Sequence, residues 1–143
     1  MNERQFVVSV YIVHENKVLL IKHKKLDMWL PVGGHVDQGE TSDEAVLREA
    51  KEETGFDIEI IGKKEPGETK KVKMLHTPNH IQLEDIYPGH QHIDLVYFGK
   101  VISGNLKQNE DEHEDIRFFS LEELEEHDEN VKYFAKKALG TKQ

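Results

Sequence analysis

The sequence contains no cysteine. Disulfide bonds, thiolate zinc sites and a cysteine nucleophile are therefore excluded, and so is a small secreted disulfide scaffold. Long apolar runs are also missing, and Met1–Gln5 has no cationic stretch followed by an apolar one. We therefore expect neither an export signal nor a membrane anchor, and a cytoplasmic location fits the sequence best.

Positive charge is scarce, because 19 Lys and Arg residues stand against 28 Asp and Glu residues and give a formal net charge of -9. Polymeric nucleic acid is not an expected partner, since binding to its backbone depends on clustered cations. The carboxylates are compatible with a divalent cation that bridges the protein to a phosphorylated small molecule. The length of 143 residues predicts a single domain over residues 1–143.

The apolar pattern predicts strands at Phe6–Val13, Val18–Lys22, Phe56–Ile61, His92–Ile102 and Arg117–Phe119. Between Lys63 and Gly89, prolines and charges predict a long irregular loop with one strand near Lys71–His76. A C-terminal helical region follows Ser120 and is interrupted near His127–Glu129. This part of the pattern therefore predicts several strands followed by a C-terminal helical region.

A helix is predicted from Thr41 to Gly55. Thr41 and Glu44 have the spacing of a capping box, in which each side chain bonds the backbone amide of the other residue, and Gly55 is a natural stop. Leu47, Ala50 and Thr54 recur at helical spacing and form the packing side. The adjoining arc of this helix is acidic.

Glu49, Glu52 and Glu53 share that arc because residues three and four apart are neighbours on a helix. Like charges this close destabilise an isolated helix, whereas a bound cation reverses the penalty. Magnesium prefers oxygen ligands and binds through one or two carboxylates together with substrate phosphates. The cluster therefore indicates metal-assisted chemistry on a phosphorylated substrate.

The order of residues from Gly34 onward is Gly34, five residues, Glu40, seven residues, then Arg48-Glu49-Ala50, Lys51, Glu52-Glu53, Thr54 and Gly55-Phe56. This resembles the complete Nudix box. The resemblance implies an α/β/α sandwich with a mixed β-sheet. It also implies a hydrolase that uses Mg²⁺, or Mn²⁺, and cleaves the diphosphate linkage of a nucleoside triphosphate, nucleotide sugar or dinucleoside polyphosphate by water attack at phosphorus.

The resemblance also implies roles for individual residues. Glu52 and Glu53 are the expected metal ligands, and Glu49 is either a further ligand or the general base. A backbone carbonyl of Gly33 or Gly34 is an additional expected ligand. Two carboxylates outside the box, Glu112 and Glu114, stay open as alternative bases. Arg48 remains protonated and is suited to orienting a box carboxylate, in a network that Glu40 can join.

Substrate contacts are expected outside the acidic helix. His35, His90 and His92 can donate hydrogen bonds to a diphosphate, although ordinary solvation of a loop explains them as well. Tyr87 lies in a loop rich in proline and histidine that could close over the substrate. Lys22 begins a basic stretch that could meet phosphates, with a solvated hairpin end as the alternative.

Other interpretations compete with the hydrolase. A histidine-bound zinc site at His76 and His80 is disfavoured, because Pro78 disrupts the helix that would align the pair. Trp29 and Phe98 are more readily core residues than a stacking surface for a nucleobase. A noncatalytic ligand sensor and an acidic interaction module remain alternative functions, and the sequence also permits a homodimer.

Overall fold

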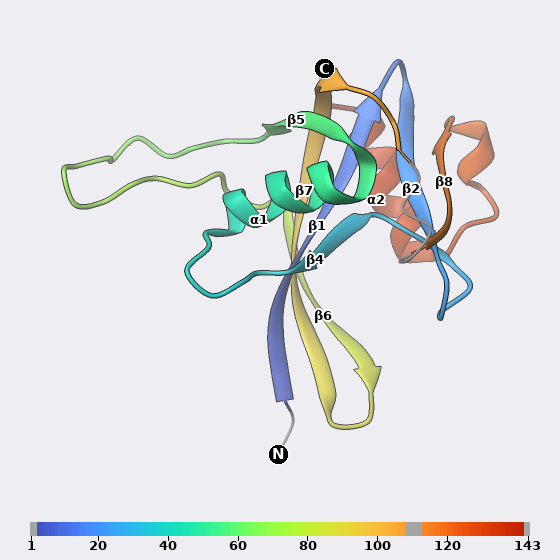
Figure 1. Cartoon of the computed structure of the whole chain (residues 1–143), viewed down its shortest axis with the longest axis horizontal. Helices are drawn as coiled ribbons and strands as arrows, with labels where there is room; N and C mark the ends of the chain where they lie inside the picture. The colour runs from blue at the N-terminus through green and yellow to red at the C-terminus, as the bar shows by residue number, and fades with distance from the viewer. Residues whose placement is uncertain (1–2, 108–112, 142–143) are drawn as a thin grey trace.

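The structure is a computed structural model that describes residues 3–107 and 113–141. Its centre is an eight-stranded mixed sheet in the order β3-β2-β1-β7-β5, with β4 paired to β1, β6 to β7 and β8 to β2 (Figure 1). The strands are β1 Glu3–His14, β2 Lys17–His23, β3 Trp29–Leu30, β4 Val32–His35, β5 Phe56–Ile61, β6 His80–Tyr87, β7 His90–Gly104 and β8 His113–Phe119. The pairing of β1 with β7 is parallel and extends along most of both strands.

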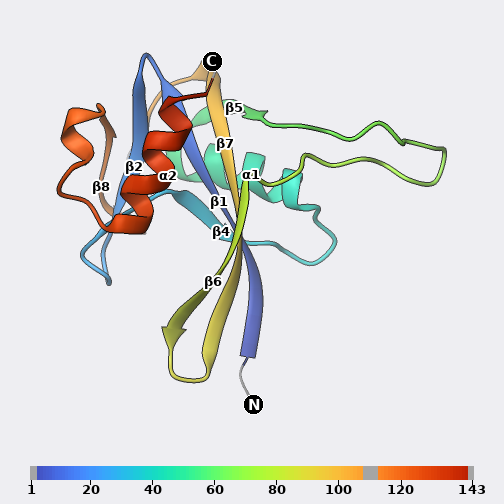
Figure 2. The same cartoon turned by 180° about the vertical axis from the view of Figure 1, so that it is seen from behind.

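Two helices cover opposite faces of this sheet, as Figures 1 and 2 show from the two sides. Helix α1, Ser42–Thr54, packs on the face that holds Val8 and Val10, whereas α2, Glu129–Leu139, packs on the face that holds Tyr11. Successive side chains of a strand alternate between faces, so the mainly apolar stretch Phe6–Val13 of β1 supplies both cores. The predicted α/β/α sandwich is confirmed.

The ends of α1 follow the predicted signals. The Thr41 hydroxyl accepts from the Glu44 amide at 3.1 Å, and the Glu44 carboxylate accepts from the Thr41 amide at 2.9 Å. Gly55 ends the helix with a φ of 86°, in the left-handed region that a glycine enters without a steric penalty. Local sequence alone therefore fixes the length of this helix.

The segment between β5 and β7 differs from the prediction. Lys71–His76 is not a strand, and only an isolated bridge joins Lys64 to His76. Residues 62–79 instead form an arm that projects from the body (Figure 1). Where the arm returns to the body, the carboxylate of Asp43 accepts from the His76 backbone amide. The strand that was missed is β6, whose alternating pattern becomes recognisable only beside its partner β7.

The C-terminal helical region is divided, as predicted. A short 3₁₀ helix, η1, spans Glu122–Leu124, and the Ser120 amide donates to the Glu123 carboxylate at 2.9 Å. Asp128 then caps α2 by accepting from the Asn130 amide. No helix in the described ranges is long and apolar enough to cross a membrane.

Candidate active site

The site begins at Gly33 and Gly34 on β4, which pair with Ser9 and Val8 of β1. A Cβ atom at Gly33 would lie 2.1 Å from the Val8 carbonyl oxygen, and one at Gly34 would lie 2.5 Å from Oε1 of Glu49. Both distances are far shorter than a van der Waals contact. The two glycines thus allow β4 to lie against β1 and allow α1 to bring a carboxylate onto β4.

Arg48 is the centre of the polar network on α1. Its guanidinium donates to the Glu40 carboxylate at 2.7 and 3.0 Å, to Glu49 at 2.8 Å, to Glu52 at 3.2 Å and to the His35 carbonyl at 3.0 Å. The hydrogen bond to Glu40 raises the pKa of Arg48, and the same bond lowers the pKa of Glu40. Arg48 is therefore a fixed cation that holds three carboxylates around it.

Glu49 and Glu53 form the buried part of the carboxylate cluster. Glu53 is only 6% exposed and accepts from the Gly33 amide at 3.1 Å. Burial raises the pKa of Glu49, while hydrogen bonds from Arg48 and with Glu53 oppose that rise. Glu52 differs from both, since 60% of its side chain is exposed. The cluster thus joins two shielded carboxylates to one that faces solvent.

The donors at this site are all oxygens and suit a hard divalent cation. Within the described ranges, no group of three or more His, Asp or Glu side chains is arranged to hold an ion by itself. Magnesium does not require such a cage, because it keeps several waters and completes its shell with substrate phosphates. Glu49, Glu52 and Glu53, with the nearby carbonyls of Gly33 or Gly34, fit that mode of binding.

The predicted substrate contacts form a row of rings on the face of the sheet opposite to the one that α1 covers. His35 on β4 contacts His92 on β7, with ring centroids 5.1 Å apart, and His92 contacts His90 at the same distance. The ring of Tyr87 stacks on that of His90, with their centroids 4.8 Å apart. A hydrogen bond of 2.7 Å joins His35 Nε2 to Gln5 Oε1. Burial lowers the pKa of His92, with help from its histidine neighbours, so its ring is neutral at pH 7.

Three other residues were predicted, and the structure places the side chain of one of them. Lys22 lies on β2, where its ammonium pairs with Asp27 at 3.2 Å. Glu112 is outside the described residues, and for Glu114 only the backbone of β8 is described. The two proposed alternative bases therefore receive no placement from the structure.

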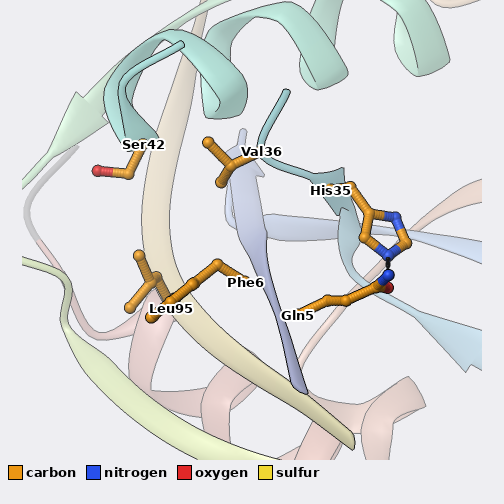
Figure 3. A pocket seen from close by; sticks show the side chains of 6 residues that line it. All are labelled: Gln5, Phe6, His35, Val36, Ser42 and Leu95. Atoms are coloured by element: carbon orange, nitrogen blue, oxygen red, sulfur yellow. Dashed lines mark hydrogen bonds between the residues drawn. The ribbon is translucent and has the colours of Figure 1, made fainter. Parts of the chain in front are cut away.

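A cavity of about 450 Å³ lies between the start of α1 and the sheet. It is lined by Gln5, Phe6, His35, Val36, Ser42 and Leu95. Figure 3 shows Phe6, Leu95 and Val36 around this space, with the His35–Gln5 hydrogen bond at one side. Glu49, Glu52 and Glu53 do not line this cavity, so the cavity is distinct from the carboxylate cluster.

Asp94 on β7 was not predicted as part of the site. It is 4% exposed and accepts from the Ser9 hydroxyl at 2.8 Å, and Ser9 is the residue that pairs with Gly33. Burial raises the pKa of Asp94 to about 8, and the neighbouring carboxylate of Glu84 adds to the rise. A lone acid inside the apolar run of this strand was the available sequence signal.

Replacing Asp94 with Asn should stabilise the protein at high pH. Below pH 3.8 the carboxyl is protonated in both the folded and the unfolded state. As the pH rises from 3.8 to about 8, the unfolded state loses the proton first, so the wild type loses stability throughout this window. The Asn variant lacks this loss.

Melting temperatures of both proteins, measured at pH values below, within and above the window, test the prediction. The melting temperature of the Asn variant minus that of the wild type should increase as the pH rises through the window. A difference that stays constant with pH would show that Asp94 is ionised in the folded protein at neutral pH.

Comparisons with known proteins give consistent results. A family model described as the NUDIX domain matches residues 3–138. An ADP-ribose pyrophosphatase of Methanocaldococcus jannaschii is 39% identical over 121 residues, which cover 82% of this chain and 62% of that protein. A probable DHNTP pyrophosphohydrolase of Lactococcus lactis is 30% identical over 135 residues, or 94% of this chain and 74% of that protein.

A solved structure agrees with the sequence relatives. The crystal structure of a NUDIX-family hydrolase from Clostridium perfringens has a TM-score of 0.83 and 34% sequence identity. The match covers 96% of this chain and 97% of that one. In contrast, the chain spans less than two-thirds of the length of the archaeal relative.

Proposed function

Because this chain belongs to the Nudix family, we propose that it hydrolyses the diphosphate linkage of a nucleoside diphosphate derivative. The observation that carries this proposal is the Arg48-centred carboxylate network, which lies over the Gly33–Gly34 segment of β4. Several like charges held so close together make little sense as a purely structural device. They suit the recognition of a metal-bound diphosphate.

The proposed division of labour follows from the environment of each side chain. Glu52 and Glu53 are the proposed metal ligands, and Arg48 orients the carboxylates without taking part in the chemistry. Glu49 is the described carboxylate best suited to accept a proton from the attacking water, since burial raises its pKa. Glu112 and Glu114 stay as alternative bases.

Magnesium or manganese bound at these oxygens would neutralise charge on the diphosphate and lower the pKa of a bound water. The protein's own contribution is to keep the carboxylates in position before the substrate arrives, with Arg48 as the common partner. No protein nucleophile is needed, in agreement with the absence of cysteine from the sequence.

The histidine row is the proposed contact for the part of the substrate beyond the reacting phosphorus. His35 follows Gly34 directly on β4, so the row begins one residue from the carboxylate cluster, with its side chains on the opposite face of the sheet, and leads by His92 and His90 of β7 to Tyr87 of β6. Neutral imidazoles can donate a hydrogen bond to a phosphate or ribose oxygen. The relatives are named for different substrates, ADP-ribose and DHNTP, but both names indicate cleavage of a diphosphate linkage.

The function is tested by incubating the purified protein, with and without Mg²⁺ or Mn²⁺, with nucleoside triphosphates, nucleotide sugars, ADP-ribose and dinucleoside polyphosphates. We expect metal-dependent release of a nucleotide or phosphate product from at least one of these classes. Calorimetry on the same panel separates an enzyme from a sensor. Tight binding without product formation would replace the hydrolase by the sensor, and neither binding nor turnover would remove both.

A further inference from the structure

The cavity beside α1 begins where the proposed diphosphate site ends. Val36, which lines the cavity, follows Gly34 by two residues, and its amide donates to the Phe6 carbonyl at 3.3 Å, which continues the pairing of β4 with β1. Two residues of extended chain span about 7 Å. Arg48 also holds this part of the lining, because its guanidinium donates to the His35 carbonyl at 3.0 Å. The cavity is therefore adjacent to the carboxylate cluster.

The side chains of the cavity are poorly suited to a charged ligand. None of the six described residues that line it is Lys, Arg, Asp or Glu, and its apolar walls are Phe6, Val36 and Leu95 (Figure 3). Moving a phosphate or a carboxylate from water into such a lining costs free energy, whereas an apolar group gains free energy in proportion to the area that it buries. At about 450 Å³, the cavity also has the size of a small-molecule site. An apolar ligand group is therefore favoured over a charged one.

Few polar side-chain atoms in the cavity are free to bind a polar ligand. Both ends of the Gln5 amide are occupied, because its Nε2 donates to Glu3 at 2.9 Å and its Oε1 is 2.7 Å from His35 Nε2. The Ser42 hydroxyl and the second ring nitrogen of His35 are the polar side-chain atoms that remain. A sugar carries several hydroxyls, and each of them costs free energy when it is buried without a partner. The cavity offers too few partners for such a group.

Phe6 is an aromatic side chain that lacks a ring partner. It lines the cavity and is still 59% exposed. The other five phenylalanines each contact another ring, whereas no ring of the described residues contacts Phe6. An apolar group bound in the cavity would cover the Phe6 ring and remove its surface from water.

We propose that the cavity binds one end of the substrate, and that this end is an uncharged, mainly apolar group joined through the diphosphate to a nucleoside. This inference rests on the proposed function. The diphosphate lies at Gly33 and Gly34, and the nucleoside lies along the histidine row. His35 connects the two ends, because its ring belongs to that row and also lines the cavity. A nucleoside triphosphate or a nucleotide sugar is a poorer substrate, since it would place charge or unpaired hydroxyls in the cavity.

Calorimetry with analogues that cannot be hydrolysed tests the inference separately from catalysis. The probes are two esters of ADP with a methylene-bridged diphosphate, of which one carries an n-hexyl group and the other a ribosyl group. In the presence of Mg²⁺, the hexyl analogue should bind about tenfold more tightly or better. Equal or tighter binding of the ribosyl analogue overturns the inference, and so does the absence of binding by both.

Phe6→Thr removes the ring from the cavity and keeps a residue that favours strands. It should weaken binding of the hexyl analogue by about fivefold or more and leave binding of the ribosyl analogue within about twofold of the wild type. The matched control is Ile102→Thr, on β7 outside the described lining and 60% exposed, which should leave both affinities within about twofold. Equal weakening of the two analogues by Phe6→Thr contradicts the assignment of the cavity.

Turnover of the corresponding hydrolysable esters separates this inference from the proposed function. If the protein cleaves the hexyl and ribosyl esters with equal kcat/KM, hydrolysis stands and the preference for an apolar group is wrong. If it cleaves neither ester but binds the hexyl analogue more tightly, the assignment of the cavity stands and the proposed hydrolysis is lost.

Discussion

Replacing Glu53 with Gln is expected to lower kcat for diphosphate hydrolysis by about 10³-fold while leaving the fold intact. Gln has the same shape, and its side-chain oxygen can still accept from the Gly33 amide, which is the bond that Glu53 makes in the folded protein. What the variant loses is a negative charge in a position that is only 6% exposed. That charge is proposed to bind the metal.

The control for this variant is Glu44→Gln on the same helix. It removes an equal charge, and Gln is accepted at this position of a capping box. Steady-state kinetics with saturating Mg²⁺ and circular dichroism of all three proteins provide the comparison. Comparable activity of Glu53→Gln and Glu44→Gln would rule out Glu53 as an essential ligand.

Gly33→Ala should lower the free energy of unfolding by about 3 kcal/mol or more. The added methyl group would stand 2.1 Å from the Val8 carbonyl oxygen, and a backbone atom cannot rotate away as the end of a side chain can. Relief of this collision requires β4 to separate from β1, at the pairing that brings Gly33 opposite Ser9. Urea denaturation measures the loss.

Gly67→Ala is the matched control, because its added methyl group would meet only the sulfur of Met74, at 3.9 Å. Its free energy of unfolding should stay within about 0.5 kcal/mol of the wild type. If Gly33→Ala unfolds at the same urea concentration as this control, the close approach of β4 to β1 is not needed for stability.

The acidic helix could be predicted because its signals are local. Thr41 and Glu44 are three residues apart, Gly55 follows the last turn, and Glu49 and Glu53 are neighbours by helical spacing alone. Strand β6 could not be predicted in the same way. Every residue of β6 is exposed or only partly buried, so what defines the strand is its antiparallel pairing with β7, a partner that local sequence does not reveal.

By itself, then, the sequence determined the box helix, the acidic arc of Glu49, Glu52 and Glu53 along it and the resemblance to a family. Only the tertiary structure decided that His35, His92, His90 and Tyr87 form one row, and that Asp94 is buried behind Gly33. The physical reason is distance along the chain. Contacts within a helical turn follow from spacing, whereas β4, β6 and β7 meet only after the sheet has assembled.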